Sequence, residues 1–378
     1  MKSKCAAPGA LPALALAVAF ALQPAHSAAA SECQWPAWER YKQAMISADG
    51  RVIDGSSEQR ISTSEGQSYG LFFALVANDR KSFDRLLAWT RNNLSAGDLN
   101  RHLPAWKWGK SPNQQWQVLD SNNASDADLW IAYSLLEAGR LWHRPELETQ
   151  GRNLLWRIAA QTLHKLPGLG LMLLPGDVGF QSAEGVRLNP SYLPLQLLVR
   201  FSSEAPVWAE LADNTRRMLV ETSPKGFAPD WLMWQADQRW GADAKGVDGS
   251  YDAIRVYLWL GMLAKDAPDR AQLLAHFKPM LEATTRLGHV PEHVDSVSGI
   301  ATGTGPVGFS AAMLPLLSAS GANAAAGVQR ERVLQAPVLA DAYYNQSLLM
   351  FGQGWDEQRY RFDKDGRLVP NWKGSCKG

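Results

Sequence analysis

Apolar residues recur along this chain at the spacing of α-helices and almost nowhere at the alternating spacing of β-strands. The residues Tyr69, Phe72, Phe73 and Val76 share one helical face. The same spacing recurs in Leu129, Ala132, Tyr133 and Leu136, and again in Ile254, Tyr257, Leu258 and Gly261. Further helices are predicted at roughly 81–94, 146–164, 191–202, 206–221, 268–284, 308–318 and 336–351. The pattern predicts an all-α protein of about ten or more helices, paired into helical hairpins.

The hairpins are expected to close into a ring. No repeat of fixed period is strong enough to indicate a solenoid. A closed ring of hairpins needs no capping repeats, and it suits a chain of this length, which contains no linker rich in Pro, Gly or Ser. We therefore predict an α/α toroid formed by one domain over residues 31–378.

The first 30 residues have the order of a cleavable secretory signal. Lys2 and Lys4 precede an apolar run at 10–22, and small residues follow at 25–30. Because about 20 apolar residues are needed to cross a bilayer, this short run with a proline inside makes a retained membrane anchor the less favoured alternative. We expect an exported protein located in the periplasm.

Charge and cysteine content narrow the possible partners. Loss of the signal removes two lysines and no acids, so the formal charge changes from +1 to −1, which argues against a nucleic-acid partner.

Cys33 and Cys376 then stand near the two ends of the mature chain. In an oxidising compartment they could form a disulfide, and the alternative is two free thiols. The 16 tryptophans favour a carbohydrate ligand only modestly, because indoles also fill cores.

Three predicted helix starts each carry a carboxylate. Ser64 precedes Glu65, Ser125 precedes Asp126, and the stretch SYD at 250–252 contains Asp252. The first two have the form of a capping box. If the three helices are parallel neighbours in a ring, their N-termini meet at one end and the acids converge there. The alternative is that each acid only caps its own helix and complements its dipole.

Two converging carboxylates are what glycosidic cleavage requires, one as proton donor and one as base or nucleophile. A helix N-terminus by itself lowers the pKa of a carboxyl group, which is wrong for a proton donor at neutral pH. The donor must therefore be desolvated, or crowded by a second carboxylate.

The sequences around these acids resemble the motifs of the family 8 glycoside hydrolases. The stretch ASDADLWIAYSLLEAGRLW at 124–142 resembles the signature segment of that family. The stretches TSEGQSYG at 63–70 and SYDAIR at 250–255 resemble its general-acid and general-base segments, and the three occur in the family's order. The resemblance covers nearly all of the mature chain and is closest to the endoglucanases that accompany bacterial cellulose synthase.

This resemblance implies an (α/α)6 barrel, an inverting mechanism and a β-1,4-glucan substrate. It makes Glu65 the proton donor and Asp252 the base that activates water. Asp126 would hold the sugar at the cleavage point and crowd Glu65. It also implies a role in cellulose biosynthesis, possible contact with the synthase complex, and no metal or organic cofactor. We expect a monomer.

Several further residues are expected to bind substrate. Arg255 would lie one helical turn after Asp252 and favour its ionised form, or else form an ordinary buried ion pair. Trp106 and Trp108 lie in a predicted loop, where at least one is expected to stack on a glucose ring; the alternative is packing. The looser matches to the family's subsites are Asn189, Tyr192 and Tyr344, together with Tyr251 beside the base.

Other readings of the sequence are less favoured. Ser68 fits the G-x-S-x-G pattern of serine hydrolases, but no apolar strand precedes it. His289 and His293 have the spacing of a metal-binding pair on a helix, but Pro291 interrupts any helix there. Within the family, chitosan, xylan or mixed-linkage glucan are alternative substrates. A non-catalytic glucan-binding protein is the alternative from another class, and the presence of all three carboxylates argues against it.

Overall fold

The computed structural model of the protein describes residues 35–336 and 342–372. The predicted signal segment, Cys33 and Cys376 lie outside these ranges, so cleavage and the disulfide stay predictions. Within the two ranges, no helix combines the length and the apolar character needed to cross a bilayer.

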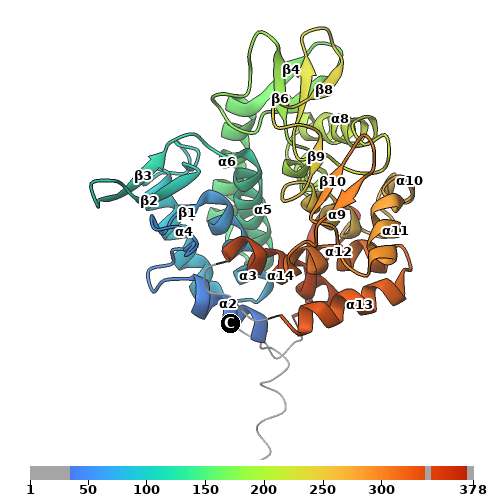
Figure 1. The fold of residues 1–378 in the computed structure, drawn as a ribbon. Helices are drawn as coiled ribbons and strands as arrows, with labels where there is room; N and C mark the ends of the chain where they lie inside the picture. The colour runs from blue at the N-terminus through green and yellow to red at the C-terminus, as the bar shows by residue number, and fades with distance from the viewer. Residues whose placement is uncertain (1–34, 337–341, 373–378) are drawn as a thin grey trace, which may run out of the picture.

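The described helices form two concentric rings (Figure 1). The inner ring consists of α3 (Ser64–Val76), α5 (Ser125–Trp142), α7 (Leu195–Ser202), α9 (Ile254–Gly261), α12 (Val307–Ala319) and α14 (Tyr343–Asp356). The outer ring consists of α2 (Pro36–Met45), α4 (Arg80–Leu94), α6 (Pro145–Thr162), α8 (Val207–Glu221), α10 (Arg270–His276), α11 (Lys278–Leu287) and α13 (Asn323–Leu334). Each inner helix contacts the next, and α14 contacts α3, which closes the ring. The predicted (α/α)6 barrel is confirmed.

The apolar pattern explains which helices lie inside. In α3 every residue except Glu65 is buried, and α12 is buried continuously from Gly308 to Leu317. A helix that is apolar all round must lie within a core. In α4, by contrast, burial follows the helical period through Phe83, Leu86 and Leu87, so one face packs inward and the other meets water.

Glycines allow the inner helices to pack closely. A Cβ on Gly261 of α9 would lie 2.2 Å from the backbone nitrogen of Leu316 in α12. A Cβ on Gly352 of α14 would lie 2.0 Å from the carbonyl oxygen of Ala311 in α12. Both distances are far inside van der Waals contact, so these two positions have no room for a side chain.

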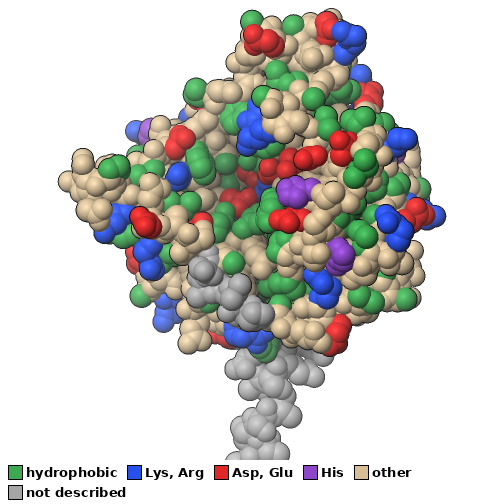
Figure 2. Space-filling model, in the orientation of Figure 1, with side chains coloured by type: hydrophobic (Ala, Val, Ile, Leu, Met, Phe, Trp, Pro, Cys, Tyr) green, Lys and Arg blue, Asp and Glu red, His purple; other side chains and the backbone are tan. Residues whose placement is uncertain are grey.

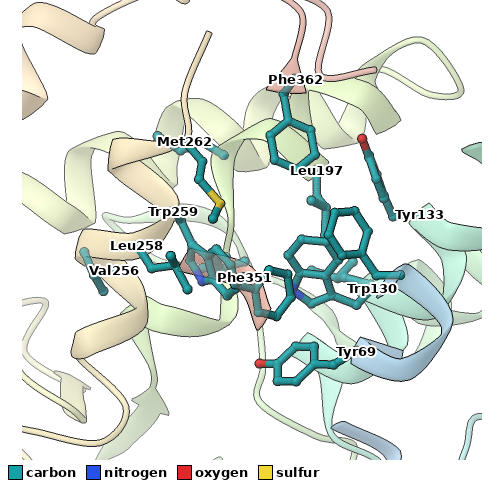
Figure 3. Packing of buried hydrophobic residues seen from close by; sticks show 14 of the residues in the cluster. Tyr69, Trp130, Tyr133, Leu197, Val256, Leu258, Trp259, Met262, Phe351 and Phe362 are labelled. Atoms are coloured by element: carbon teal, nitrogen blue, oxygen red, sulfur yellow. The ribbon is translucent and has the colours of Figure 1, made fainter. Parts of the chain in front are cut away.

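Aromatic rings fill the centre of the barrel (Figure 3). The ring of Phe351 lies 5.0 Å from Tyr69, 5.3 Å from Trp130 and 5.1 Å from Trp259, measured between centroids. These three partners come from α3, α5 and α9, the helices whose first turns were predicted to carry the acids. The aromatic cluster therefore fixes these three helices relative to one another.

Short antiparallel strands contradict the prediction of almost no β-structure. In the described part of the chain they form five small sheets: β1 (Ser62–Thr63), β2 (Lys107–Lys110) and β3 (Trp116–Asp120); β4 (Leu163–Leu166) and β5 (Gly170–Leu173); β6 (Gly185–Leu188), β7 (Leu232–Gln235) and β8 (Trp240–Ala242); β9 (Asp248–Gly249), β10 (His293–Asp295) and β11 (Ala301–Thr302); β12 (Tyr360–Phe362) and β13 (Leu368–Pro370). Strands of two to five residues are too short to show alternation. Trp108 accordingly lies in β2, opposite Ser62, and not in a loop.

The strands gather mainly on one face of the barrel. The connections that lead from an outer helix into α3, α5, α9 and α12 are long and contain strands, among them β1 before α3, β3 before α5, β9 before α9 and β11 before α12. The connections from an inner helix to its outer partner are short: two or three residues join α3 to α4, α5 to α6 and α12 to α13. In Figure 1 most labelled strands lie at the upper end and to the left. Long loops on a rigid scaffold are where binding residues usually lie.

Three predicted helices have different bounds. The segment 191–202 is a 3-10 turn (Pro190–Tyr192) followed by α7, because Pro194 prevents a continuous helix. The segment 268–284 is divided into α10 and α11 at Phe277, with Pro279 in the first turn of α11. The segment 336–351 gives α14, which begins at Tyr343 and continues to Asp356.

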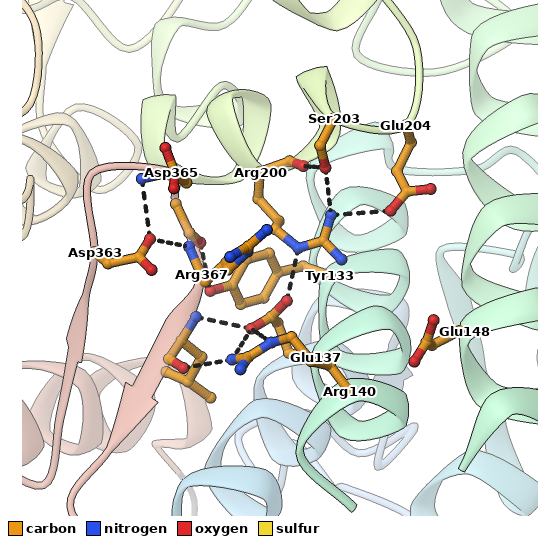
Figure 4. Close-up of polar contacts among 12 residues, drawn as sticks. Tyr133, Glu137, Arg140, Glu148, Arg200, Ser203, Glu204, Asp363, Asp365 and Arg367 are labelled. Carbon is orange, nitrogen blue, oxygen red and sulfur yellow. Dashed lines mark hydrogen bonds and ion pairs between the residues drawn. The ribbon is translucent and has the colours of Figure 1, made fainter. Parts of the chain in front are cut away.

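A buried carboxylate joins the C-terminal hairpin to the barrel (Figure 4). Glu137 of α5 is fully buried and accepts hydrogen bonds from Arg200 at 2.7 Å, from Arg140 at 2.6 Å, and from the backbone N–H of Leu368 at 2.8 Å. The hydroxyl of Tyr133, one turn earlier, donates to the carbonyl of Gly366. Two inner helices and the hairpin β12–β13 thus share one polar centre.

We expect Glu137→Gln to lower the free energy of unfolding by about 3 kcal/mol, because the two arginines lose a buried counter-charge. The matched control is Glu148→Gln, which breaks the more exposed pair with Arg152 and should cost less than about 1 kcal/mol. Urea unfolding of both variants measures the difference. Equal losses would mean that the buried network does not secure the hairpin.

Candidate active site

The three acids from the helix starts meet on one guanidinium group. Arg255 Nη1 lies 2.5 Å from Glu65 Oε2 and 3.0 Å from Asp126 Oδ2, and its Nη2 lies 2.7 Å from Asp252 Oδ1. The side chain of Arg255 is only 3% exposed. The structure thus brings the three predicted acids together, and it places the predicted arginine beside all of them.

The helix caps differ from the predicted ones. Helix α3 begins one residue earlier than expected, so Thr63 is its N-cap, with Oγ1 accepting from the N–H of Gly66. Gln67 does not close a capping box, because its amide binds Val52 and Thr90. Ala124 likewise precedes α5 without a side-chain cap.

Asp252 lies in a turn before α9 and not in the first turn of the helix. The carboxylate of Asp230 caps that turn, with Oδ1 accepting from the N–H groups of Ser250, Asp252 and Ala253 at 2.7, 3.1 and 2.7 Å. Burial, followed by the charge of Asp252, raises the pKa of Asp230. Asp230 was missed in the sequence, because nothing near it marks a cap for a segment 20 residues further on.

Asp126 has a shifted pKa. Burial raises its pKa from 3.8 to about 7, and the charge of Glu65 adds to the shift while Arg255 opposes it. Its Oδ1 accepts from the N–H of Ala127. The sequence required one carboxyl group that stays protonated near neutral pH, and this property belongs to Asp126.

Glu65 has a second partner that the sequence did not single out. The hydroxyl of Tyr343 donates to Glu65 Oε1 at 2.7 Å and lies 3.3 Å from Thr63 Oγ1. Tyr343 stands next to the predicted Tyr344, so the motif pointed to the correct segment but to the adjacent ring.

Two tyrosines pack around Arg255. Its guanidinium carbon lies 5.5 Å from the ring centroid of Tyr192 and 5.7 Å from that of Tyr344. The hydroxyl of Tyr344 donates to the carbonyl of Tyr251, whose own ring is 45% exposed and hydrogen-bonded to Glu292. The exposed Tyr251 ring is therefore open to a ligand.

The remaining predicted residues have unequal access. Asn189 is buried and caps the turn at Ser191 through its Oδ1. Trp108 is enclosed by Trp89 and by Trp116, whose ring is parallel to it at 5.2 Å. Trp106 is partly exposed at the end of β2 nearest Glu65. Both tryptophans are partly exposed, and Lys107 Nζ lies 5.6 Å from the centroid of the Trp106 ring.

Figure 2 shows acidic side chains, in red, gathered at a hollow near the centre of the molecular surface. A cavity of about 530 Å³ is lined by residues including Asn123 and Asp177, and another of about 570 Å³ is lined by residues including Phe180 and Arg187. The segment 177–180 contributes to both. Neither cavity is lined by Glu65, Asp126, Asp252 or Arg255.

Within the described ranges, no group of three or more His, Cys, Asp or Glu residues is arranged to hold a metal ion. The positive charge among the three acids comes from Arg255.

Known proteins resemble this chain over almost its whole length. Residues 12–358 match the family model described as glycosyl hydrolases family 8. The chain is 54% identical to an endoglucanase of Salmonella typhi over 92% of its length and 94% of that protein, and 51% identical to an endoglucanase of Escherichia coli (strain K12) over 96% of both. The crystal structure of an endo-1,4-D-glucanase from Vibrio fischeri ES114 superposes with a TM-score of 0.86 and 46% identity, covering 90% of this chain and 99% of that one.

We expect Asp126→Asn to flatten the pH dependence of stability. Because the pKa of Asp126 is raised in the folded protein, folding takes up a proton between about pH 4 and pH 7, and this contribution to stability is lost as pH rises. The variant should therefore gain most over wild type above pH 7, in urea unfolding at pH 4.5, 6 and 8.

Asp243→Asn is the control with the opposite sign. Burial raises the pKa of Asp243, but the hydrogen bonds from Arg187 outweigh burial, so the pKa is lowered. Replacing Asp243 should therefore reduce the free energy of unfolding most at pH 8. Parallel curves for wild type and Asp126→Asn would contradict a raised pKa at Asp126.

Proposed function

The chain belongs to glycosyl hydrolase family 8, and from this membership we propose that it is an endo-β-1,4-glucanase that cleaves internal bonds of a cellulose-like chain with inversion. The observation that carries the proposal is the meeting of Glu65, Asp126 and Asp252 on Arg255. Relatives named endoglucanase support the substrate class.

Glu65 is proposed as the proton donor to the leaving oxygen. In the structure its Oε2 shares Arg255 Nη1 with Asp126, whose pKa is about 7. Burial keeps Asp126 partly protonated near neutral pH. We propose that this proton reaches the leaving oxygen through Glu65, while the hydroxyl of Tyr343 orients the other oxygen of Glu65.

Asp252 is proposed as the base that removes a proton from the attacking water. Its Oδ1 binds Arg255 Nη2, so the width of a guanidinium group separates it from Glu65, which binds Nη1. An inverting pair stands roughly 6.5 to 9.5 Å apart so that a water fits between the sugar and the base. The proposal of inversion rests on the resemblance to the family's general-acid and general-base segments.

Asp126 is proposed to hold the sugar at the cleavage point. Asp126 is the central acid, because its helix α5 contacts both α3, which carries Glu65, and the 3-10 turn that carries Tyr192. The partly exposed rings of Trp106 and Tyr251 are the proposed stacking surfaces on the two sides.

We further propose a periplasmic location and a role in cellulose production, with action as a monomer and possible contact with the synthase complex. The support is the order of charge, apolar core and small residues in the first 30 positions, together with the resemblance to the cellulose-associated endoglucanases. The substrate alternatives stay chitosan, xylan or mixed-linkage glucan, and the non-enzymatic alternative is a glucan-binding protein.

Purified mature protein on soluble carboxymethyl-cellulose should reduce viscosity rapidly while releasing few reducing ends. Glu65→Gln and Asp252→Asn should each lower kcat by about 10² to 10⁴. The control Glu221→Gln alters an acid of outer helix α8 and should retain full activity. The first product detected by NMR should have the α-anomeric configuration.

Wild-type protein that binds glucan but does not cleave glucan, chitosan or xylan would instead indicate the binding protein. A β-configured first product would exclude inversion.

A further inference from the structure

A tryptophan outside the predicted set contacts the proposed base. The indole N–H of Trp231 donates to Asp252 Oδ2 at 2.9 Å. We infer that Trp231 is a positioning residue, which fixes the orientation of the Asp252 carboxylate for proton removal from water. This inference rests on the proposed function, because it concerns the residue to which that function assigns the base.

The hydrogen bond from Trp231 fixes a rotation that Arg255 alone does not fix. The terminal torsion of an aspartate is broad, so a single donor leaves the carboxylate plane free to turn. Arg255 Nη2 donates to Oδ1 at 2.7 Å, and Trp231 donates to Oδ2 from a different segment of the chain. With one donor on each oxygen, the plane of the carboxylate is defined.

Trp231 is itself held by charged and aromatic neighbours. The guanidinium carbon of Arg187 lies 3.9 Å from its ring centroid, and Asp243 holds Arg187 through two hydrogen bonds at 2.6 and 3.2 Å. The ring of Tyr192 lies 5.8 Å away at a steep angle. Because Arg187 covers one face of the indole, that face is not a stacking surface for sugar, which favours the positioning role.

The residue before Trp231 holds the backbone of the same turn. Asp230 Oδ1 accepts from the N–H groups of Ser250, Asp252 and Ala253. Two consecutive residues thus hold the backbone and the side chain of the base. Such supporting contacts around a reactive group typically change activity by about 10- to 100-fold when they are removed.

The other charged and titratable groups around Asp252 are Arg255, Asp230, Asp126, Tyr192 and Tyr344. Trp231→Phe changes none of them and keeps an aromatic ring against Arg187. Its direct effect is therefore the loss of one hydrogen bond to the carboxylate.

The test compares Trp231→Phe with Trp240→Phe. Trp240 also donates its indole N–H to a carboxylate, Glu221 Oε2 at 2.7 Å, on the outer surface. Trp231→Phe should lower kcat on carboxymethyl-cellulose about 10-fold or more with KM changed less than about threefold. Because a hydrogen bond favours the ionised carboxylate, the acid limb of the pH profile should also move to higher pH. Trp240→Phe should leave all three quantities unchanged.

An unchanged kcat and acid limb in Trp231→Phe would overturn the inference, and so would a loss confined to KM, which would indicate a sugar platform. If Trp231→Phe does not unfold cooperatively, β-(3-benzothienyl)alanine at position 231 removes the N–H and keeps the shape, with the same expected and overturning results. A wild-type protein without activity would count against the proposed function itself, since the comparison of variants requires an active parent.

Discussion

The acid cluster depends on one buried cation, Arg255, which Glu65, Asp126 and Asp252 share. Arg255 is nearly inaccessible to water, and its two terminal nitrogens bind acids from three separate parts of the chain. Removing a guanidinium group and carboxylates from water is unfavourable unless they find one another with good geometry. Three carboxyl groups surround one guanidinium group, so negative charges would outnumber positive ones. The central acid, Asp126, reduces the free-energy cost of its burial by retaining a proton. The same close grouping of buried charges therefore accounts for the proposed chemistry and for the unfavourable electrostatic energy of the site.

The barrel makes this arrangement possible. The inner helices are apolar on every side, and the aromatic rings at their centre fix α3, α5 and α9 directly beneath the acids. Tyr69 belongs to both levels, because its ring packs on Phe351 and its hydroxyl accepts from Arg255. A well-packed core of this kind can support a destabilised polar site at one end.

The sequence predicted the features that long, regular patterns specify. The long helices followed from periodicity, whereas the convergence of Glu65, Asp126 and Asp252 was conditional on parallel neighbouring helices and gained its support from the resemblance to the family's motifs. The short strands were missed because two to five residues give no measurable alternation. Asp230, Trp231 and Tyr343 were missed for another reason: each reaches the site from a separate segment, and only the tertiary fold brings it within a hydrogen bond of its partner.

The closure of the inner ring links the timing of synthesis to the appearance of the site. Helix α14 packs between α12 and α3, and its first residue, Tyr343, binds Glu65 near the opposite end of the chain. A ribosome therefore releases the segments with all three acids before it makes the residue that orients Glu65. The hydrogen bond from Tyr343 to Glu65 can form only after almost the whole chain has been made, so an unfinished chain carries the acids without this contact. Loop-closure entropy opposes contacts over such separations.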